Sequence, residues 1–220
     1  MTIDVAAQPW PVRAGLELLD EEGFEAVTVR AVAARAGRTP MAVYRHVEDV
    51  DDLLRRVVRL VFEHWESRVY GVLDVADPLR RLERYAHVYL SYAREHPNRY
   101  DVLFVLGHGI GTDRFPEGFG DEAASTFRIL REAVAEARTS EPAGEGPRDP
   151  SPDEVALGLW STVHGLVMLR RSGRFPDERA FGRVFRGTVS RLLQALGPAD
   201  GSPGTDASDV TEAAGKGEPG

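Results

Sequence analysis

Residues 28–44, TVRAVAARAGRTPMAVY, decide the fold, because they predict two short helices joined by a tight turn. The first helix has a valine and alanine face, and Thr28 precedes it as a candidate N-cap. Gly37 supplies the backbone freedom that the turn needs. Thr39 is a candidate cap for the second helix, and Pro40 suits its first position, where a missing N–H costs nothing. This is the outline of a helix-turn-helix, whose second helix enters the DNA major groove.

The composition limits the classes of function. The 220 residues suffice for a small domain and a medium one, and an apolar fraction of 42% allows a buried core. A formal net charge of −8 argues against non-specific coating of nucleic acid or anionic membrane, but a specific DNA-binding protein needs positive charge only where it touches DNA. The chain has no cysteine, which excludes disulfides and thiolate metal sites. We see no secretory signal and no run of about 20 apolar residues, and we expect a cytoplasmic protein without a membrane partner.

Helical periodicity continues on both sides of the opening stretch. A first helix is predicted from Trp10 to Gly23, after a mobile arm at residues 1–8. Asp77-Pro78 and Ser151-Pro152 read as an N-cap followed by proline at the first helical position. Nothing reads as a strand, so we expect an all-α fold of about nine helices. After the opening stretch, helices are predicted over residues 50–70, 77–96, 121–138, 151–171 and 177–196. A short apolar segment is predicted at 100–106, loops at 107–120 and 139–152, and a disordered tail at 198–220.

A glycine-rich stretch offers a rival interpretation. Residues 102–111, VLFVLGHGIG, could form a strand and a phosphate loop of a nucleotide-dependent enzyme. However, the spacing is not Gly-x-Gly-x-x-Gly, no helix starts directly after it, and no parallel strands flank it. The chain also contains no P-loop, no Gly-x-Ser-x-Gly elbow and no paired-carboxylate site. We therefore expect neither an enzyme nor a cofactor.

The chain resembles the tetracycline-repressor (TetR) family of bacterial regulators. The motifs that carry the resemblance are EGFEA at 22–26, TV at 28–29, ARAG at 34–37, TP at 39–40, VYRH at 43–46 and LL at 53–54. The second half resembles one branch of that family through Trp160 and His164-Gly165, preceded by His96-Pro97 and Tyr100. The resemblance implies a helix-turn-helix DNA-binding domain at 9–54 and an effector-binding and dimerisation domain at 55–197, followed by the tail.

One departure from the family bears on DNA affinity. Where the family usually has Phe and, three residues later, a phosphate-holding Lys, this chain has Val47 and Val50. Residues 1–50 also carry five arginines against eight acidic residues, a net charge of −3. We therefore expect non-specific DNA affinity to be low and strongly dependent on salt.

Ten residues are candidate DNA contacts. Phosphate contacts are expected at Thr39, at the start of the second helix, and at family-matching Thr28, Tyr44 and His46. An alternative is that Tyr44 packs on the first helix and Arg45 is a solvated surface residue. Base contacts are expected at Arg38, Met41, Ala42 and Arg45, since arginine pairs with guanine and small apolar groups meet the thymine methyl, and Arg30 and Pro40 complete the set.

The expected effector is a largely apolar small molecule, bound in a cavity between the C-terminal helices. Trp160, His164 and Met168 lie at i, i+4 and i+8, so they share one helix face. An alternative is that the aromatic residues are ordinary core and that His164 bonds a backbone carbonyl. No second ligand lies at metal-binding distance along that helix, so we expect no metal. The full candidate set is Trp65, Tyr85, Tyr89, Tyr92, Phe104, Phe127, Trp160, His164 and Met168.

The resemblance also implies a homodimer on a palindromic double-stranded operator, formed through the last two helices. Phe181, Phe185, Leu192 and Leu196 suit that interface, unless they cover the core of their own chain. We expect a repressor whose ligand favours a conformer in which the helix at 50–70 swings the DNA-binding units apart. Two alternatives stay open: a ligand-free dimeric DNA-binding protein, and a small-molecule-binding protein or enzyme with a degenerate DNA-binding domain.

Overall fold

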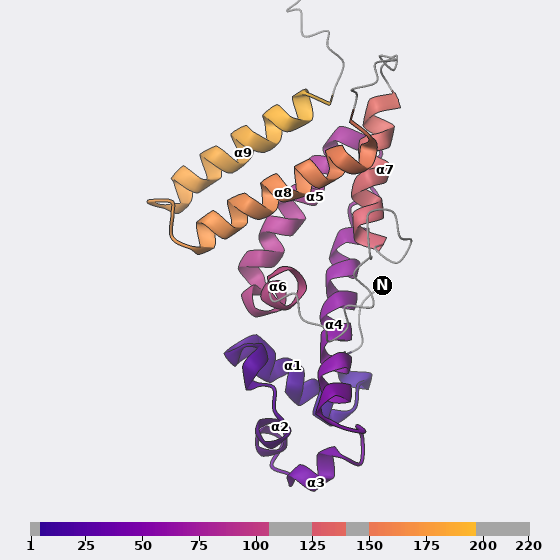
Figure 1. Cartoon of the computed structure of the whole chain (residues 1–220), viewed down its shortest axis with the longest axis vertical. Helices are drawn as coiled ribbons and strands as arrows, with labels where there is room; N and C mark the ends of the chain where they lie inside the picture. Colours follow the sequence, from indigo (N-terminus) through magenta and orange to yellow (C-terminus); the bar gives the residue numbers. More distant parts are fainter. Residues whose placement is uncertain (1–4, 106–124, 140–149, 197–220) are drawn as a thin grey trace, which may run out of the picture.

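The computed structural model describes residues 5–105, 125–139 and 150–196, and within these ranges it contains helices and no strand (Figure 1). The all-α expectation is confirmed. Residues 1–4 of the predicted arm at 1–8, the loop at 107–120 and the tail at 198–220 lie outside the described residues. The helices are α1 (Trp10–Glu22), α2 (Val29–Arg35), α3 (Pro40–Val43), α4 (Val50–Tyr70), α5 (Pro78–Glu95), α6 (Pro97–Phe104), α7 (Ser125–Thr139), α8 (Pro152–Arg171) and α9 (Glu178–Gln194), with 3₁₀ turns at Val5–Ala7 and Phe24–Ala26.

Helices α1 to α3 form one end of the molecule, and α5 with α7 to α9 forms the other (Figure 1). The long helix α4 belongs to both ends, because it packs on α1 near its start and on α5 and α7 further along. The short helix α6 lies between the two ends and contacts α1, α4 and α5. Two helices therefore connect the helix-turn-helix to the C-terminal body.

Most helix starts follow from local chemistry. The side chain of Asp49 accepts a hydrogen bond from the backbone N–H of Asp52 at 2.7 Å, and Asp77 caps α5 in the same way. Ser151, the predicted N-cap of α8, forms a capping box with Glu154. Each cap satisfies a backbone donor that has no partner inside the helix.

Two predictions about helix starts need correction. Thr28 caps α2 as predicted, and Thr39 and Pro40 occupy the predicted N-cap and first turn of α3, but the hydroxyl of Thr39 accepts no capping hydrogen bond and α3 is only four residues long. Pro97 was expected only to end a helix, with an apolar segment beginning at Tyr100. Instead Pro97 occupies the first turn of α6, where its missing N–H needs no partner.

The packing of α1 on α4 depends on Gly15. A Cβ atom at this position would lie 2.8 Å from Cγ2 of Val57 and 3.4 Å from Cγ1 of Val27. Both valines are buried, with 0% and 3% of their surface exposed, so neither can move into solvent. The glycine therefore lets α1 approach α4 more closely than any larger residue would.

The substitution Gly15→Ala should destabilise the chain by about 1–3 kcal/mol, the usual cost of overpacking a well-packed core. Helix propensity alone would favour alanine by about 1 kcal/mol, so a net loss isolates the steric effect. Urea denaturation measures the change. An unchanged or raised midpoint would show that α1 and α4 can separate without cost.

Phe181 and Phe185 belong to the core of their own chain. They are 0% and 1% exposed, and their rings lie 5.6 Å apart. The expectation that they serve a dimer interface is therefore wrong, because packing of α9 on α5 already covers them. Leu192 and Leu196 are only half-buried.

Candidate DNA-binding surface and effector core

Helix α3 and the turn before it form the tip of the molecule (Figure 1). Gly37 has φ of 63°, in the left-handed region that favours glycine, which confirms the predicted turn. Val32, Ala33 and Val43 are buried and hold α2 and α3 on the rest of the domain. The opposite face of this helix pair is consequently left for solvent or for a ligand.

The predicted DNA contacts are largely exposed to solvent. Met41 is 71% exposed, high for a large apolar side chain. Ala42 is half-buried, and the other nine are exposed: Thr28, Arg30, Arg38, Thr39, Pro40, Met41, Tyr44, Arg45 and His46.

Trp10, which sequence reasoning did not select, organises two of these side chains. The Arg38 guanidinium lies over the Trp10 ring, 5.0 Å from its centroid. The His46 ring meets the same ring edge-on at 5.7 Å. Tyr44, by contrast, is 48% exposed. The cation–π contact restrains Arg38, so less side-chain entropy remains to be lost when it binds a ligand.

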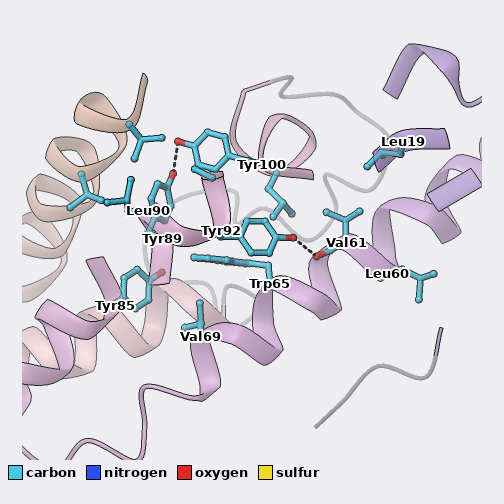
Figure 2. Close-up of a cluster of buried hydrophobic side chains, with 14 of the residues drawn as sticks. Leu19, Leu60, Val61, Trp65, Val69, Tyr85, Tyr89, Leu90, Tyr92 and Tyr100 are labelled. Atoms are coloured by element: carbon cyan, nitrogen blue, oxygen red, sulfur yellow. Dashed lines mark hydrogen bonds between the residues drawn. The ribbon is translucent and has the colours of Figure 1, made fainter. Parts of the chain in front are cut away.

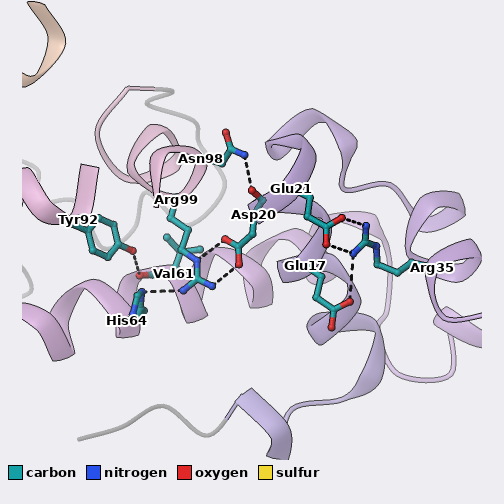
Figure 3. A network of polar contacts seen from close by, with 9 residues as sticks. All are labelled: Glu17, Asp20, Glu21, Arg35, Val61, His64, Tyr92, Asn98 and Arg99. Carbon is teal, nitrogen blue, oxygen red and sulfur yellow. Dashed lines mark hydrogen bonds and ion pairs between the residues drawn. The ribbon is translucent and has the colours of Figure 1, made fainter. Parts of the chain in front are cut away.

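Half of the acidic residues in 1–50 are paired with arginines that are not candidate DNA contacts. Arg35 binds Glu21 through two hydrogen bonds and lies within 4 Å of Glu17 and Glu22 (Figure 3). Asp20 is bound to Arg99 of the other domain. Four of the eight acidic residues are thus paired elsewhere, while the candidate contacts Arg30, Arg38 and Arg45 remain exposed.

The start of α4 offers no positive charge in place of the family's lysine. Val50 is 40% exposed, and Asp49 caps the helix. The Asp52 carboxylate accepts the backbone N–H of Glu48 at 3.0 Å and pairs with Arg56, one turn further along. A DNA phosphate would therefore meet carboxylates here.

The candidate effector residues belong to one aromatic cluster, of which Figure 2 shows Trp65 and the tyrosines Tyr85, Tyr89 and Tyr92. The Trp65 ring lies at its centre, with the rings of Tyr85, Tyr89, Tyr92 and Phe104 at 5.1–6.2 Å, all T-shaped. Edge-to-face contacts of this kind add to the stabilisation from burial. The cluster continues through Trp160, whose ring lies 6.5 Å from Phe104, 6.3 Å from Phe127 and 6.4 Å from His164. Met168 is half-buried against the same core.

His164 hydrogen-bonds two tyrosine hydroxyls, not the backbone carbonyl of the alternative interpretation. Its Nδ1 lies 2.8 Å from the Oη atoms of Tyr89 and Tyr100, which are 3.2 Å apart. Burial lowers the pKa of His164 and raises that of Tyr100 to about 12. The lowered pKa favours the neutral imidazole, and Nδ1 and the two hydroxyl oxygens all lie within hydrogen-bonding distance of one another. Tyr100 is a member that sequence reasoning used only as a family marker.

The space beside this cluster is small. A cavity of about 20 Å³ lies between α5, α7, α8 and α9. That is room for about one water molecule, whereas ligand pockets measure about 300 Å³ or more. Of the candidate set, only Tyr85, Tyr89 and Trp160 reach it. The rest of its lining is aliphatic: Leu82, Ala86, Leu130, Leu159, Val163, Val189, Leu192 and Leu193.

A polar network joins α6 to the DNA-binding helices (Figure 3). Arg99 donates from Nε and Nη2 to the two carboxylate oxygens of Asp20, each at 2.6 Å. Its Nη1 lies 2.9 Å from Nδ1 of His64 on α4. Asn98 donates to the backbone carbonyl of Asp20 at 3.0 Å. Arg99 thus contacts both α1 and α4.

The next two residues of α6 bind the C-terminal body. Tyr100 belongs to the His164 cluster, and Asp101 accepts two hydrogen bonds from Arg171 on α8, both at 2.7 Å. The Arg171 guanidinium also lies 5.2 Å above the Tyr100 ring. Four consecutive residues of α6, from Asn98 to Asp101, therefore bind α1, α4, α5 and α8.

This junction should make stability depend on pH. Burial, and then the charge of Arg99, lower the pKa of His64 to about 4; burial also lowers the pKa of His96 and His164. Between pH 6.5 and 4 the unfolded chain thus binds more protons than the folded chain. The free energy of unfolding should therefore fall as pH drops through this window, by about 1 kcal/mol for His64 after allowance for solvent screening.

Urea unfolding at pH 7.5 and pH 5 measures this difference. His64→Gln removes one titrating group, so the free energy of unfolding of this variant should depend less on pH. Equal free energies of unfolding at both pH values in the unsubstituted chain would contradict the predicted pH dependence.

Comparison with known proteins identifies the family. Residues 82–211 match the model of the tetracyclin repressor-like C-terminal domain, and residues 12–57 match that of the bacterial regulatory proteins of the tetR family. The chain belongs to the TetR family. It is therefore a DNA-binding transcriptional regulator. Regulators of this family bind operators, dimerise and bind ligands through the C-terminal domain.

Relatives agree with the TetR-family assignment. The chain is 26% identical over 195 residues to an uncharacterised HTH-type transcriptional regulator of Mycobacterium tuberculosis, covering 84% of this chain and 79% of that protein. Its fold is similar to that of the TetR-family regulator PfmR from Thermus thermophilus, with a TM-score of 0.57, 17% identity and coverage of 84% and 98%. Its fold is also similar to that of a protein of unknown function from Rhodococcus sp. RHA1, with a TM-score of 0.64 and 17% identity. That match covers 87% of this chain and 97% of the Rhodococcus chain. Within the described ranges, no helix of this TetR-family chain is long and apolar enough to cross a membrane.

Proposed function

We propose that this TetR-family regulator is a repressor that binds an inverted-repeat operator as a homodimer and leaves it when a largely apolar small molecule enters the C-terminal core. The proposal rests on the contacts of two consecutive residues of α6. Tyr100 binds the aromatic core through His164, and Arg99 binds α1 through Asp20. A regulator that responds to a ligand needs such a connection, because the ligand must bind two conformers with different affinity.

At the DNA-binding end, the exposed side chains suit major-groove recognition. Arg38 and Arg45 carry guanidinium groups that can pair with guanine, and Met41 can meet a thymine methyl. The hydroxyls of Thr39 and Tyr44 are exposed and can bind phosphate. In this proposal Trp10 fixes the direction of Arg38.

At the effector end, the aromatic core supplies apolar surface and one polar group. The cavity beside it is too small for a ligand, so an effector must displace side chains of Tyr89 or Trp160 as it enters. The Tyr89 hydroxyl would then lose its contact with His164, and the effector could take its place with a polar atom of its own. An apolar molecule with one hydrogen-bonding group fits this chemistry.

The proposed coupling runs along α6. Disturbing the hydrogen bonds of His164 frees Tyr100, the residue directly after Arg99. Movement of α6 would shift Arg99 and, through Asp20, the helix α1 that carries Trp10. Together with a swing of α4, this would change the separation of the two recognition helices, which must match half-sites about one DNA turn apart.

The proposed dimer uses the outer faces of α8 and α9. Leu169 is 47% exposed and Val184 is 44% exposed. A Cβ atom added to Gly158 or Gly165 would meet nothing within 4 Å in the single chain, so these glycines leave room for close approach of a second helix. Two-fold packing of the α8–α9 pair would bury both apolar side chains.

Gly165→Leu should therefore weaken the dimer by at least about tenfold, by filling this close contact. In an isolated chain the same change would raise helix stability. Analytical ultracentrifugation over a dilution series measures the dissociation constant. Gly187→Ala on α9, where an added Cβ also meets nothing, maps how far the interface extends. An unchanged constant in Gly165→Leu would place the interface elsewhere.

Selection of random DNA duplexes by the full chain tests the function itself. The proposal expects enrichment of an inverted repeat whose half-sites lie about one helical turn apart. Recovery of unrelated duplexes, at the frequency of a bead control, would overturn it.

The closed core favours one rival, a dimeric DNA-binding protein without an effector. The two proposals differ in whether small-molecule extracts change operator affinity. If a ligand acts as proposed, DNA must weaken ligand binding by the same factor as ligand weakens DNA binding.

A further inference from the structure

A basic groove lies on the outer face of α5, away from the aromatic core. Its volume is about 500 Å³, and it runs along α5 beside the end of α4. Three arginines line it, Arg68, Arg84 and Arg94, and none of its described lining residues is acidic. The chain as a whole carries 35 acidic and 27 basic residues, so this local excess of positive charge opposes the overall balance.

The carboxylates at the rim do not neutralise these arginines. Arg68 pairs with Glu95 at 2.9 Å. Arg94 pairs with Glu178, but Glu178 is shared with Arg170, whose Nη2 lies 2.7 Å away. Arg84 has no ion pair or hydrogen bond to any described residue. Of the three arginines that line the groove, Arg84 is therefore unpaired among the described residues, and Arg94 shares its carboxylate with Arg170, which lies outside the groove.

The shape of the groove selects among anions. Arg84 and Arg94 are ten residues apart on α5, a separation of about 15 Å along the helix axis. Between them lie His87, whose ring meets Phe185 edge-on at 5.6 Å, and the aliphatic side chains of Val88 and Leu90. A single inorganic ion cannot reach both arginines, whereas an extended molecule can lie on the aliphatic floor with an anionic group at each end.

We propose that this groove binds an extended organic anion that carries carboxylate or phosphate groups, at a site separate from the effector core. The planar guanidinium group matches both kinds of anion with two parallel hydrogen bonds. A concave surface of one charge sign also concentrates counter-ions from solution. The volume lies within the range of about 300–1,000 Å³ that small-molecule sites occupy.

Isothermal titration calorimetry on the full chain tests this site at constant ionic strength. Decanedioate is the carboxylate probe and decane-1,10-diyl bisphosphate the phosphate probe; binding of either one supports the site and assigns its chemistry. Arg84→Gln should weaken binding by about tenfold or more, because it removes a charge-assisted pair. It should leave the fold intact, since Arg84 holds no other described residue. Arg80→Gln, on the exposed face of the same helix but outside the groove, is the matched control and should bind as the unsubstituted chain does.

A second variant separates a groove from diffuse surface charge. Ser91→Leu fills the groove and changes no charge, so it should also weaken binding, with circular dichroism confirming the fold. Absence of saturable binding of both probes at millimolar concentration would overturn the proposal. Equal affinities in Arg84→Gln and Arg80→Gln, or undiminished affinity in Ser91→Leu, would overturn it as well.

Discussion

Replacing Arg99 with leucine should lower the free energy of unfolding by about 2 kcal/mol and separate the motions of the two ends of the molecule. The side chain of Arg99 is 13% exposed and that of Asp20 36%, so the cost lies below the roughly 3–5 kcal/mol of a fully buried pair. The loss leaves the Asp20 carboxylate without its two strongest hydrogen bonds. Amide hydrogen exchange in α1 should then accelerate more than exchange in α8.

A double-mutant cycle isolates the interaction. Arg99→Leu, Asp20→Asn and the double variant should give a coupling energy of about 1–2 kcal/mol. Arg128→Leu is the matched control, because the only pair that Arg128 forms with a described residue is an exposed one, with Glu132 at 3.9 Å. This substitution should cost no more than about 0.5 kcal/mol. Additive effects of the two junction substitutions, or an equal cost for Arg128→Leu, would remove the junction from the proposed coupling.

Replacing Tyr44 and Arg45 together with alanine should reduce operator affinity by about 100-fold or more, since each base or phosphate contact is worth about 1–3 kcal/mol. Both side chains are exposed, so thermal stability should stay within about 0.5 kcal/mol of the unsubstituted chain. Fluorescence anisotropy with a labelled operator duplex measures the affinity. The loss would therefore report on contact with DNA and not on folding.

Arg59→Ala removes an exposed arginine from α4, away from the recognition surface, and serves as the control. It should change operator affinity by less than about threefold. If the control weakens binding as much as the double substitution, the recognition surface lies elsewhere. The individual substitutions then divide the effect: Arg45→Ala should relax base preference, whereas Tyr44→Ala should weaken binding to all sequences alike.

The parts of the fold that sequence predicts well are those that depend on neighbours along the chain. Thr28, Asp49 and Ser151 cap their helices within three residues of themselves, and Gly37 adopts its positive φ inside one turn. Such features leave direct marks in the sequence. Thr39 is the exception. It occupies the N-cap position of α3, as Thr28 does in α2, but its hydroxyl accepts no capping hydrogen bond.

The parts that sequence did not predict depend on distant contacts. Arg99 and Asp20 are 79 positions apart, and Tyr89 and His164 are 75 apart. No local pattern distinguishes these side chains from solvated ones. The aromatic cluster was foreseen as a set, but its closure to about 20 Å³ follows from packing among four helices. Phe181 and Phe185 were assigned to the wrong surface for the same reason, since periodicity gives the apolar face of α9 but not its partner.

The most direct test of the account is the affinity of the full chain for duplex DNA from upstream of its own gene, compared with a shuffled duplex of the same composition, at physiological salt. We expect a saturating complex of two chains per duplex to form at least about 1,000-fold more tightly on the upstream DNA than on the shuffled DNA. The double substitution of Tyr44→Ala with Arg45→Ala should remove this preference. Equal affinity for both duplexes, in the unsubstituted chain, would contradict it.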